Sequence, residues 1–197
     1  MTNKDKIIYE ALLLFSRDGF EAASTRAIAR AVHCSDAVIY KHFKSKKEIL
    51  NAIVEICSRR FMEHAGRVPQ AEMSLEKLGE FCLAMFDFQT RDKWIVPFRQ
   101  LLMIEQFRDE EMKELYQTFF IYQPVAFTEK IFEELMKLGY MKTGNPRVYA
   151  MKLYGPFFLY HTAGEDRDGE LRRMLKEHVE IFCKNMAATQ NPIYKCG

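Results

Sequence analysis

Hydroxyl, basic and aromatic side chains are concentrated in one segment, TRAIARAVHCSDAVIYKHFKSKKEIL, which runs from Thr25 to Leu50. Side chains of these types donate hydrogen bonds to phosphate oxygens and, from a helix, can reach the edges of bases. The small residues Ala29 and Ala31 would allow two short helices to pack closely. The spacing therefore predicts two short helices joined by a tight turn, a unit whose second helix fits the ~12 Å wide major groove of DNA.

Residue patterns that support catalysis are missing from the sequence. It has no glycine-rich phosphate loop, no G-x-S-x-G, no H-E-x-x-H and no convincing pair of carboxylates. His33 and Cys34 do not suggest a metal site, because adjacent residues point apart on a helix and no further ligands cluster nearby. We therefore predict a binding protein, with no enzymatic activity, no cofactor and no metal.

The five cysteines are odd in number, scattered, and never spaced as C-x-x-C. This pattern argues against both a disulfide framework and a zinc cluster, and it favours reduced, mostly buried thiols. Cys34, in the predicted turn, leaves redox sensing open as an alternative function. Cys196 lies in a polar tail, where we expect it to be exposed to oxidation.

Composition places the chain among folded, water-soluble proteins. It has 197 residues, 48% of them hydrophobic, and a formal net charge of +2, which is too balanced for a protein that coats nucleic acid by charge alone. The longest apolar runs, such as residues 53–57 and 118–122, fall far short of the ~20 residues needed to cross a bilayer. Since no signal peptide is apparent either, we expect a cytoplasmic protein without a membrane span.

Apolar residues recur at helical spacing almost everywhere, so the fold class is predicted to be all-α, with about nine helices. The first helix should bury Ile7, Ile8, Ala11, Leu12 and Phe15 and end at Asp18-Gly19. A second should follow Ser24/Thr25, and a third should run from about Ser35 to Lys41. Ser45 and Glu48 form a predicted capping box at the start of a fourth, which should continue to about His64.

Proline, asparagine and aspartate mark the expected ends of the later helices. Asp92 should cap a helix that begins at Trp94, and a break is expected near Pro124 within residues 109–139. Asn145-Pro146 should begin a helix that is kinked at Gly155-Pro156, and Asp168 should cap the last one. The predicted domains are a DNA-binding head over 1–47, a helical effector-binding and dimerisation domain over 48–190, and a tail over 191–197.

The Thr25–Leu50 segment resembles the TetR family of bacterial regulators, whose pattern of T-x-x-x-I-A-x-x, a turn, then S-x-x-x-(I/L)-Y-x-(H/Y)-F-x-x-K-x-x-L is matched through most of its positions. Leu14-Phe15 and Gly19-Phe20 also fit the family's upstream pattern. The resemblance implies a three-helix head on a helical ligand-binding bundle. It also implies that nine residues meet DNA, namely Thr25, Arg26, Ser35, Asp36, Ala37, Tyr40, Lys41, His42 and Lys46.

Two residues depart from the family pattern. His33 stands where glycine is frequent in the turn, so it must either adopt a left-handed conformation or lengthen the turn. Asp36 stands where a basic or neutral residue is common. A carboxylate near phosphates is costly unless it accepts a hydrogen bond from a cytosine amino group or pairs with a nearby cation, and both alternatives remain open at this point.

The C-terminal portion is rich in aromatic residues and methionine, which is typical of a core but also of an apolar cavity for a small molecule. Arg99, Gln100, Glu105 and Tyr154 are candidate polar groups in such a cavity. The predicted ligand-binding residues are Phe86, Trp94, Phe98, Met103, Phe107, Tyr122, Tyr154 and Phe158. A homodimer should form through the last two helices, and its predicted interface residues are Met151, Phe158, Leu171, Leu175, His178 and Phe182.

These features predict a dimeric transcriptional regulator that binds a near-palindromic operator in double-stranded DNA. Two recognition helices would enter successive major grooves ~34 Å apart, and an apolar effector would favour a conformation that no longer matches this spacing. Such a protein would act as a repressor that its ligand releases from DNA. The alternative is an architectural DNA-binding protein with a solid C-terminal core and no effector.

Overall fold

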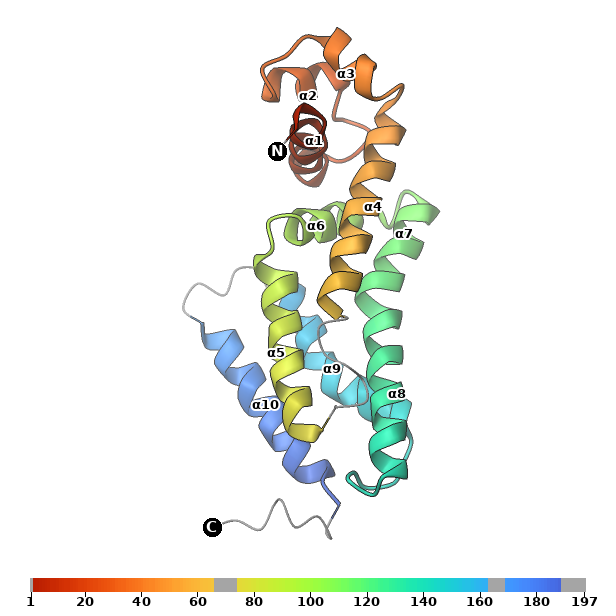
Figure 1. Cartoon of the computed structure of the whole chain (residues 1–197), viewed down its shortest axis with the longest axis vertical. Coiled ribbons are helices and arrows are strands. Elements are labelled where there is room, and N and C mark those ends of the chain that lie inside the picture. The colour runs from red at the N-terminus through yellow and green to blue at the C-terminus, as the bar shows by residue number, and fades with distance from the viewer. Residues whose placement is uncertain (1, 66–73, 163–168, 189–197) are drawn as a thin grey trace. The chain divides into compact units, whose positions relative to one another are not determined.

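The chain folds into helices throughout the part that the computed structural model describes, which comprises residues 2–65, 74–162 and 169–188. No strand is assigned in those ranges, and an isolated bridge pairs Met141 with Ala187. The all-α prediction is thereby confirmed. The helices in chain order (Figure 1) are α1 (Asn3–Asp18), α2 (Thr25–Ala31), α3 (Asp36–His42), α4 (Lys46–Ala65), α5 (Leu75–Arg91), α6 (Ile95–Glu105), α7 (Glu110–Gln117), the π-helical turn Thr118–Tyr122, α8 (Gln123–Lys137), α9 (Pro146–Thr162) and α10 (Glu170–Met186).

The chain divides into two compact units, and each combines segments that are distant in sequence. Unit 1 comprises Met1–Ala65 and Arg91–Tyr116, and unit 2 comprises Gly66–Thr90 and Gln117–Gly197. Helices α4 and α6 therefore pack with the predicted head rather than with the rest of the C-terminal portion. The proposed functional boundary at residue 47 stays a prediction, as does the tail, which lies outside the described residues. None of the described helices has the length and apolar character that crossing a bilayer requires.

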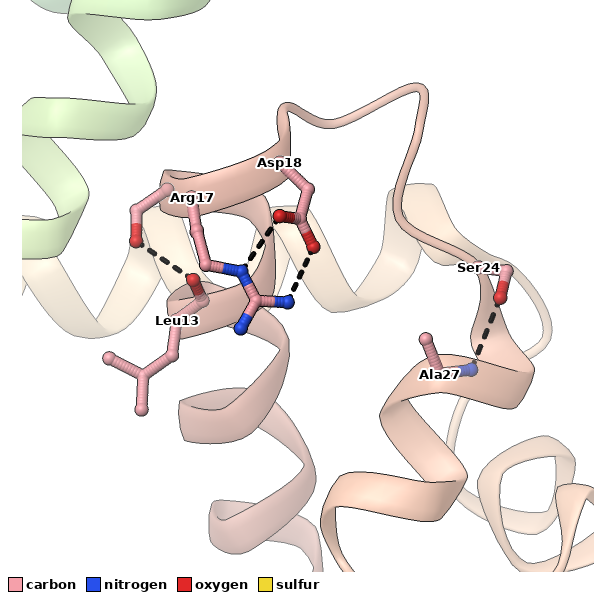
Figure 2. Close-up of polar contacts among 6 residues, drawn as sticks. Leu13, Arg17, Asp18, Ser24 and Ala27 are labelled. Carbon is pink, nitrogen blue, oxygen red and sulfur yellow. Dashed lines mark hydrogen bonds and ion pairs between the residues drawn. The ribbon is translucent and has the colours of Figure 1, made fainter.

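Helix α1 forms the centre of unit 1. Its five predicted core residues are all buried, and it packs against α2, α4 and α6. Ser24 accepts a hydrogen bond from the Ala27 N–H and caps α2, as Figure 2 shows. The recognition helix α3 is held by the buried side chains of Ile39 and Phe43, in agreement with the expectation that Phe43 is a core residue.

The turn between α2 and α3 shows which of the two expectations for His33 is correct. His33 adopts φ 55°, in the left-handed region. Its N–H donates to the carbonyl of Arg30, and the N–H of Cys34 donates to the carbonyl of Ala29 at 2.9 Å. The turn therefore keeps its short length because a non-glycine residue takes the left-handed conformation, which histidine tolerates better than β-branched residues do.

The predicted start signals of α4 and α6 are present. Ser45 accepts a hydrogen bond from the Glu48 N–H, and Glu48 accepts one from the Lys44 N–H at 2.7 Å. Asp92 accepts hydrogen bonds from the N–H groups of Trp94 and Ile95 at 2.9 and 3.2 Å. The same carboxylate pairs with Arg60 of α4, so one aspartate caps α6 and ties it to α4.

Asp92→Asn is expected to lower the free energy of unfolding at neutral pH by about 1–2 kcal/mol, because the amide can still cap α6 but no longer carries the negative charge that pairs with Arg60. Burial acts to raise the pKa of Asp92, but the hydrogen bonds from Arg60, Trp94 and Ile95 outweigh burial and hold that pKa below its usual value. A group with a lowered folded-state pKa stabilises the protein above its unfolded pKa and loses this effect as pH falls through the folded value.

The stability difference between wild type and Asp92→Asn should therefore be largest near neutral pH and shrink in acid, as measured by urea denaturation across a pH series. Asp18→Asn is the matched control, because Asp18 pairs with Arg17 on an exposed surface (Figure 2) and such pairs contribute little. Equal losses in both variants at every pH would contradict a stabilising role for the Asp92 charge beside Arg60.

Unit 2 is built around a core shared by α5, α8, α9 and α10. Buried apolar residues from all four helices meet there, among them Leu78, Phe132, Leu153 and Val179. Helix α10 lies against α5, where the Cys183 thiol contacts the Leu75 carbonyl at 3.2 Å and Arg172 pairs with Asp87 at 3.0 Å. Figure 1 shows α8 and α9 packed along each other in the same unit.

The break expected near Pro124 takes the form of a π-helical turn, Thr118–Tyr122, between α7 and α8. Proline has no N–H, so Pro124 cannot donate to the carbonyl of Phe120 as an α-helix would require. The Tyr154 hydroxyl of α9 donates to this carbonyl at 2.8 Å instead. At Gly155-Pro156, where a kink is predicted, α9 continues without interruption and Pro156 lies inside the helix. The predicted cap Asp168 lies outside the described residues.

Candidate nucleic-acid interface

The start of α2 and the solvent-facing side of α3 form one polar surface, which we call the α2–α3 face. Seven of the predicted DNA-binding residues lie on these helices, and an eighth, Ser35, precedes α3 as its N-cap. Tyr40 is 55% exposed although it is a large aromatic residue, which leaves its ring available for a partner. The exposed members are Arg26, Ser35, Ala37, Tyr40 and Lys41, and the partly exposed members are Thr25, Asp36 and His42.

Two side-chain contacts join the first turn of α2 to α3 across this face. The hydroxyls of Thr25 and Tyr40 are 3.5 Å apart. Arg26 Nε lies 3.4 Å from Asp36 Oδ2. The second contact shows that Asp36 pairs with a nearby cation, which is one of the two ways in which a carboxylate at this position becomes less costly. Thr25 and Tyr40 are 15 positions apart in the sequence, so the fold brings their two hydroxyl donors together on this face.

Lys46 is positioned differently from the prediction. Its ammonium donates to the carbonyls of Phe20 and Glu21 at 2.6 and 3.1 Å and lies 4.5 Å from the centre of the Phe20 ring. The Lys46 side chain is 22% exposed, so its ammonium binds the turn between α1 and α2 instead of facing solvent. Lys44 and Arg30, which were not among the predicted contacts, are exposed basic residues of the same segment.

The turn between α1 and α2 is also held from α6. The buried Glu105 carboxylate accepts a hydrogen bond from the Phe20 N–H at 2.8 Å. Gly19 adopts φ +86°, and a Cβ atom there would lie 2.9 Å from Glu105 Oε1. Glu105 was a candidate polar group of the effector cavity, but the structure assigns its carboxylate to this backbone contact. We call the contacts of Glu105 and Lys46 with this turn the α1–α2 clamp.

The predicted ligand-binding residues fall into two groups, one in each unit. In unit 1, Trp94 and Phe98 are core residues, and the Trp94 ring packs 5.0 Å from that of Tyr9. Met103 is partly buried. Phe107 is 88% exposed, because it lies just beyond the end of α6 instead of on its buried side, and its place in a ligand site stays a prediction.

In unit 2, three of the predicted residues form an aromatic cluster together with His161. The rings of Phe86 and His161 stack with their centres 5.7 Å apart, and Tyr154 contacts His161 edge-on at 6.2 Å. Phe158 lies 6.5 Å from Tyr154. Tyr122 is 55% exposed and lies outside this cluster. His161 was not among the predicted ligand-binding residues, although its spacing of seven residues from Tyr154 places both on one side of α9.

The predicted dimer residues are divided by burial. Leu175 and Phe182 are buried in the core of unit 2, so their side chains pack within their own subunit and do not form an exposed surface for a partner chain. The reason is that the apolar stripe of α10 packs against its own subunit. Met151 is 57% exposed, and Phe158, Leu171 and His178 are partly exposed. The other large apolar side chains that α9 and α10 expose are Val148, Leu159, Met174 and Ile181.

The thiols in the described part of the chain are free, and two of the four are fully buried. Burial raises the pKa of Cys82 to about 12 and that of Cys183 to about 11, and it also raises the pKa of Cys57. A raised pKa keeps a thiol protonated and unreactive at neutral pH. Cys34 is partly exposed. No group of three His, Cys, Asp or Glu side chains in the described ranges is arranged to hold a metal ion.

A family model described as "Bacterial regulatory proteins, tetR family" matches residues 7–53. The regulator IcaR of Staphylococcus epidermidis, a negative transcriptional regulator of the biofilm operon icaADBC, is 31% identical over 114 residues, which are 58% of this chain and 61% of IcaR. IcaR of Staphylococcus aureus strain Newman is 33% identical over 100 residues, which are 50% of this chain and 53% of that protein. The chain thus matches about half to three fifths of the length of these relatives.

Solved structures resemble the chain over nearly its whole length. The complex of SmeT with triclosan superposes with a TM-score of 0.71 at 20% identity and covers 96% of this chain and 94% of SmeT. SmeT is described as the repressor of a multidrug efflux pump of Stenotrophomonas maltophilia. AibR, solved with isovaleryl coenzyme A and operator DNA, gives a TM-score of 0.68 at 20% identity and covers 91% of this chain and 97% of AibR. At this identity the likeness establishes the fold alone.

Proposed function

We propose that this chain is a member of the tetR family of bacterial regulatory proteins and acts as a dimeric transcriptional repressor which a small, largely apolar molecule releases from DNA. The α2–α3 face is the observation that carries this proposal. It presents exposed donors on two short helices at the spacing that a helix-turn-helix needs to cross a phosphate backbone and enter a major groove. Such a protein works where the chromosome lies, so we place it in the cytoplasm.

The exposed apolar residues of α9 and α10 support a homodimer. Met151 and Leu159 are 57% and 61% exposed on α9, and Ile181 is 52% exposed on α10. Met151, Gly155 and Leu159 are spaced by four residues and therefore share one side of α9. Burying such a stripe against a second copy would remove apolar surface from water and present two α2–α3 faces to one operator.

Aromatic side chains in unit 2 support the effector part of the proposal. The cluster of Phe86, Tyr154, Phe158 and His161 offers flat apolar rings together with one hydroxyl and one imidazole. An apolar molecule with a polar group suits this combination. The repressors SmeT and AibR, which share the fold, were solved with triclosan and with isovaleryl coenzyme A respectively. An effector would act by binding better to the conformation that does not fit the operator.

The proposal is tested by selecting bound fragments from genomic DNA with the purified full-length chain and then titrating the best fragment in a salt series. Tyr40→Ala is expected to weaken specific binding about 10-fold or more, because it removes the exposed ring and hydroxyl of α3. Tyr40→Phe is the matched control for the ring, since it removes only the hydroxyl.

A near-palindromic site that the Tyr40→Ala variant binds weakly is the expected result. Only weak, sequence-indifferent binding by the wild type would contradict a repressor and favour an architectural DNA-binding protein. The effector is tested on the same fragment with triclosan as an apolar probe, which should lower the affinity of wild type for the operator if the aromatic cluster accepts such molecules.

A further inference from the structure

One acidic side chain interrupts the basic and neutral surface of the α2–α3 face. Asp36 is the only Asp or Glu in α2 and α3, where the other charged groups are Arg26, Arg30, Lys41 and the titratable His42. It occupies the first turn of α3, and its side chain is 43% exposed. The N-terminal residues of a recognition helix are those that contact base edges, so an exposed group here would face the bases if the proposed function is correct.

A carboxylate at this position repels phosphates unless its charge is offset. Arg26 Nε lies 3.4 Å from Asp36 Oδ2, and the Arg26 side chain is 84% exposed. This exposure makes the pair weak as a source of stability. The exposure of Arg26 also allows a second contact. A guanidinium has five N–H donors, and its single contact with Oδ2 leaves other donors that can reach a phosphate. The pair can therefore lie beside a DNA backbone, because the guanidinium offsets the charge of the carboxylate.

Pairing through Oδ2 leaves Oδ1 as an acceptor on the same carboxylate. In the major groove guanine presents only acceptors (N7 and O6), and thymine presents an acceptor and a methyl group. Adenine presents a donor directly beside the N7 acceptor, which repels a carboxylate, whereas cytosine presents the N4 amino donor alone. An ionised carboxylate that reaches the groove is therefore complementary to cytosine.

We propose that Asp36, oriented by Arg26, selects a cytosine at one position of each operator half-site. This inference rests on the proposed function, since it requires that the α2–α3 face bind double-stranded DNA. In a two-fold symmetric dimer, the two cytosines occupy equivalent positions in the two half-sites. Arg26 acts as a positioning residue for Asp36 and as a phosphate contact.

The test is selection from a random double-stranded DNA library with the full chain, carried out in parallel for wild type, Asp36→Asn and Asp36→Ala. Wild type is expected to prefer cytosine at one position by about 10-fold or more. Asp36→Asn should shift that same position to adenine, because an amide bonds the adenine N6 and N7 together. Asp36→Ala should lose preference there, retain the other positions, and bind random DNA more strongly than wild type.

Glu55→Gln is the control for net charge. Glu55 is exposed on α4, so this variant also removes one negative charge from unit 1, but outside α2 and α3. It should leave the base preference unchanged. The double variant Arg26→Ala/Asp36→Ala separates the two roles: Arg26→Ala alone should weaken all DNA binding, and adding Asp36→Ala should recover part of that loss because no unshielded carboxylate remains.

The outcomes distinguish this inference from the proposed function. If wild type selects a site but Asp36→Ala and Asp36→Asn select the same bases at every position, Asp36 does not read a base and the inference is overturned. A preference for adenine in wild type overturns the choice of cytosine. If wild type selects no site at all while its circular dichroism shows a folded helical protein, the proposed function fails as well.

Discussion

Leu159→Glu on α9 is expected to convert the dimer into a monomer and to lower the affinity for a complete operator about 100-fold or more. Leu159 is 61% exposed, so a charged side chain there is compatible with the fold of a single subunit. In the proposed dimer the same carboxylate would be buried in an apolar interface, which is strongly unfavourable. Loss of the second α2–α3 face removes the gain of about 10²–10⁴-fold that two linked binding modules can have over one.

Sedimentation velocity reports the oligomeric state, and fluorescence anisotropy reports affinity for the complete operator and for one half-site. The half-site affinity should be the same in wild type and Leu159→Glu, because each α2–α3 face is unaltered. Leu138→Glu is the matched control: Leu138 is 64% exposed, lies at the end of α8, and undergoes the same substitution outside α9 and α10. A Leu159→Glu protein that remains dimeric would place the interface elsewhere.

Glu105→Ala is expected to lower the free energy of unfolding by about 1–3 kcal/mol, because it removes the acceptor of the Phe20 N–H and breaks one side of the α1–α2 clamp. The Glu105 carboxylate is buried, so in the variant bulk water cannot hydrogen-bond to the Phe20 N–H in its place unless the surrounding structure rearranges. Lys46 would still hold the carbonyls of Phe20 and Glu21, and the turn should therefore loosen rather than unfold. Urea denaturation and the exchange rate of the Phe20 amide hydrogen measure the two effects.

Glu105→Gln is the matched control, since its amide oxygen can still accept from the Phe20 N–H and the loss should be smaller. Gly19→Ala supplies an independent check. The new Cβ would lie 2.9 Å from Glu105 Oε1, and φ +86° is strained for alanine. In the Glu105→Ala background the part of the destabilisation that comes from the clash with Glu105 should disappear. The part that comes from the strained backbone of residue 19 should remain. Wild-type stability and amide exchange in Glu105→Ala would show that the clamp does not hold this turn.

The local elements of this protein could be predicted from its sequence because the signals are local. Apolar residues at helical spacing identified the buried side of α1, and Asp92 and Ser45 were identified as caps because a capping side chain acts within three residues of its own position. The helix-turn-helix segment is equally local, which explains why its pattern indicated the family. The position of His33 in a tight turn likewise left only two alternatives, a left-handed conformation or a longer turn.

Tertiary packing decided the rest, because it brings together residues that no sequence spacing relates. Leu175 and Ile181 are both apolar residues of α10, yet the first is buried in its own subunit and the second is 52% exposed. Lys46 is a basic residue of the kind that contacts phosphates, but its ammonium donates a hydrogen bond to the carbonyl of Phe20, 26 positions earlier in the chain. By itself, the sequence determined the helices, the helix-turn-helix motif and the buried side of α1. Only the fold determined which apolar residues of α10 are buried in their own subunit and which face water, since burial depends on neighbours from elsewhere in the chain.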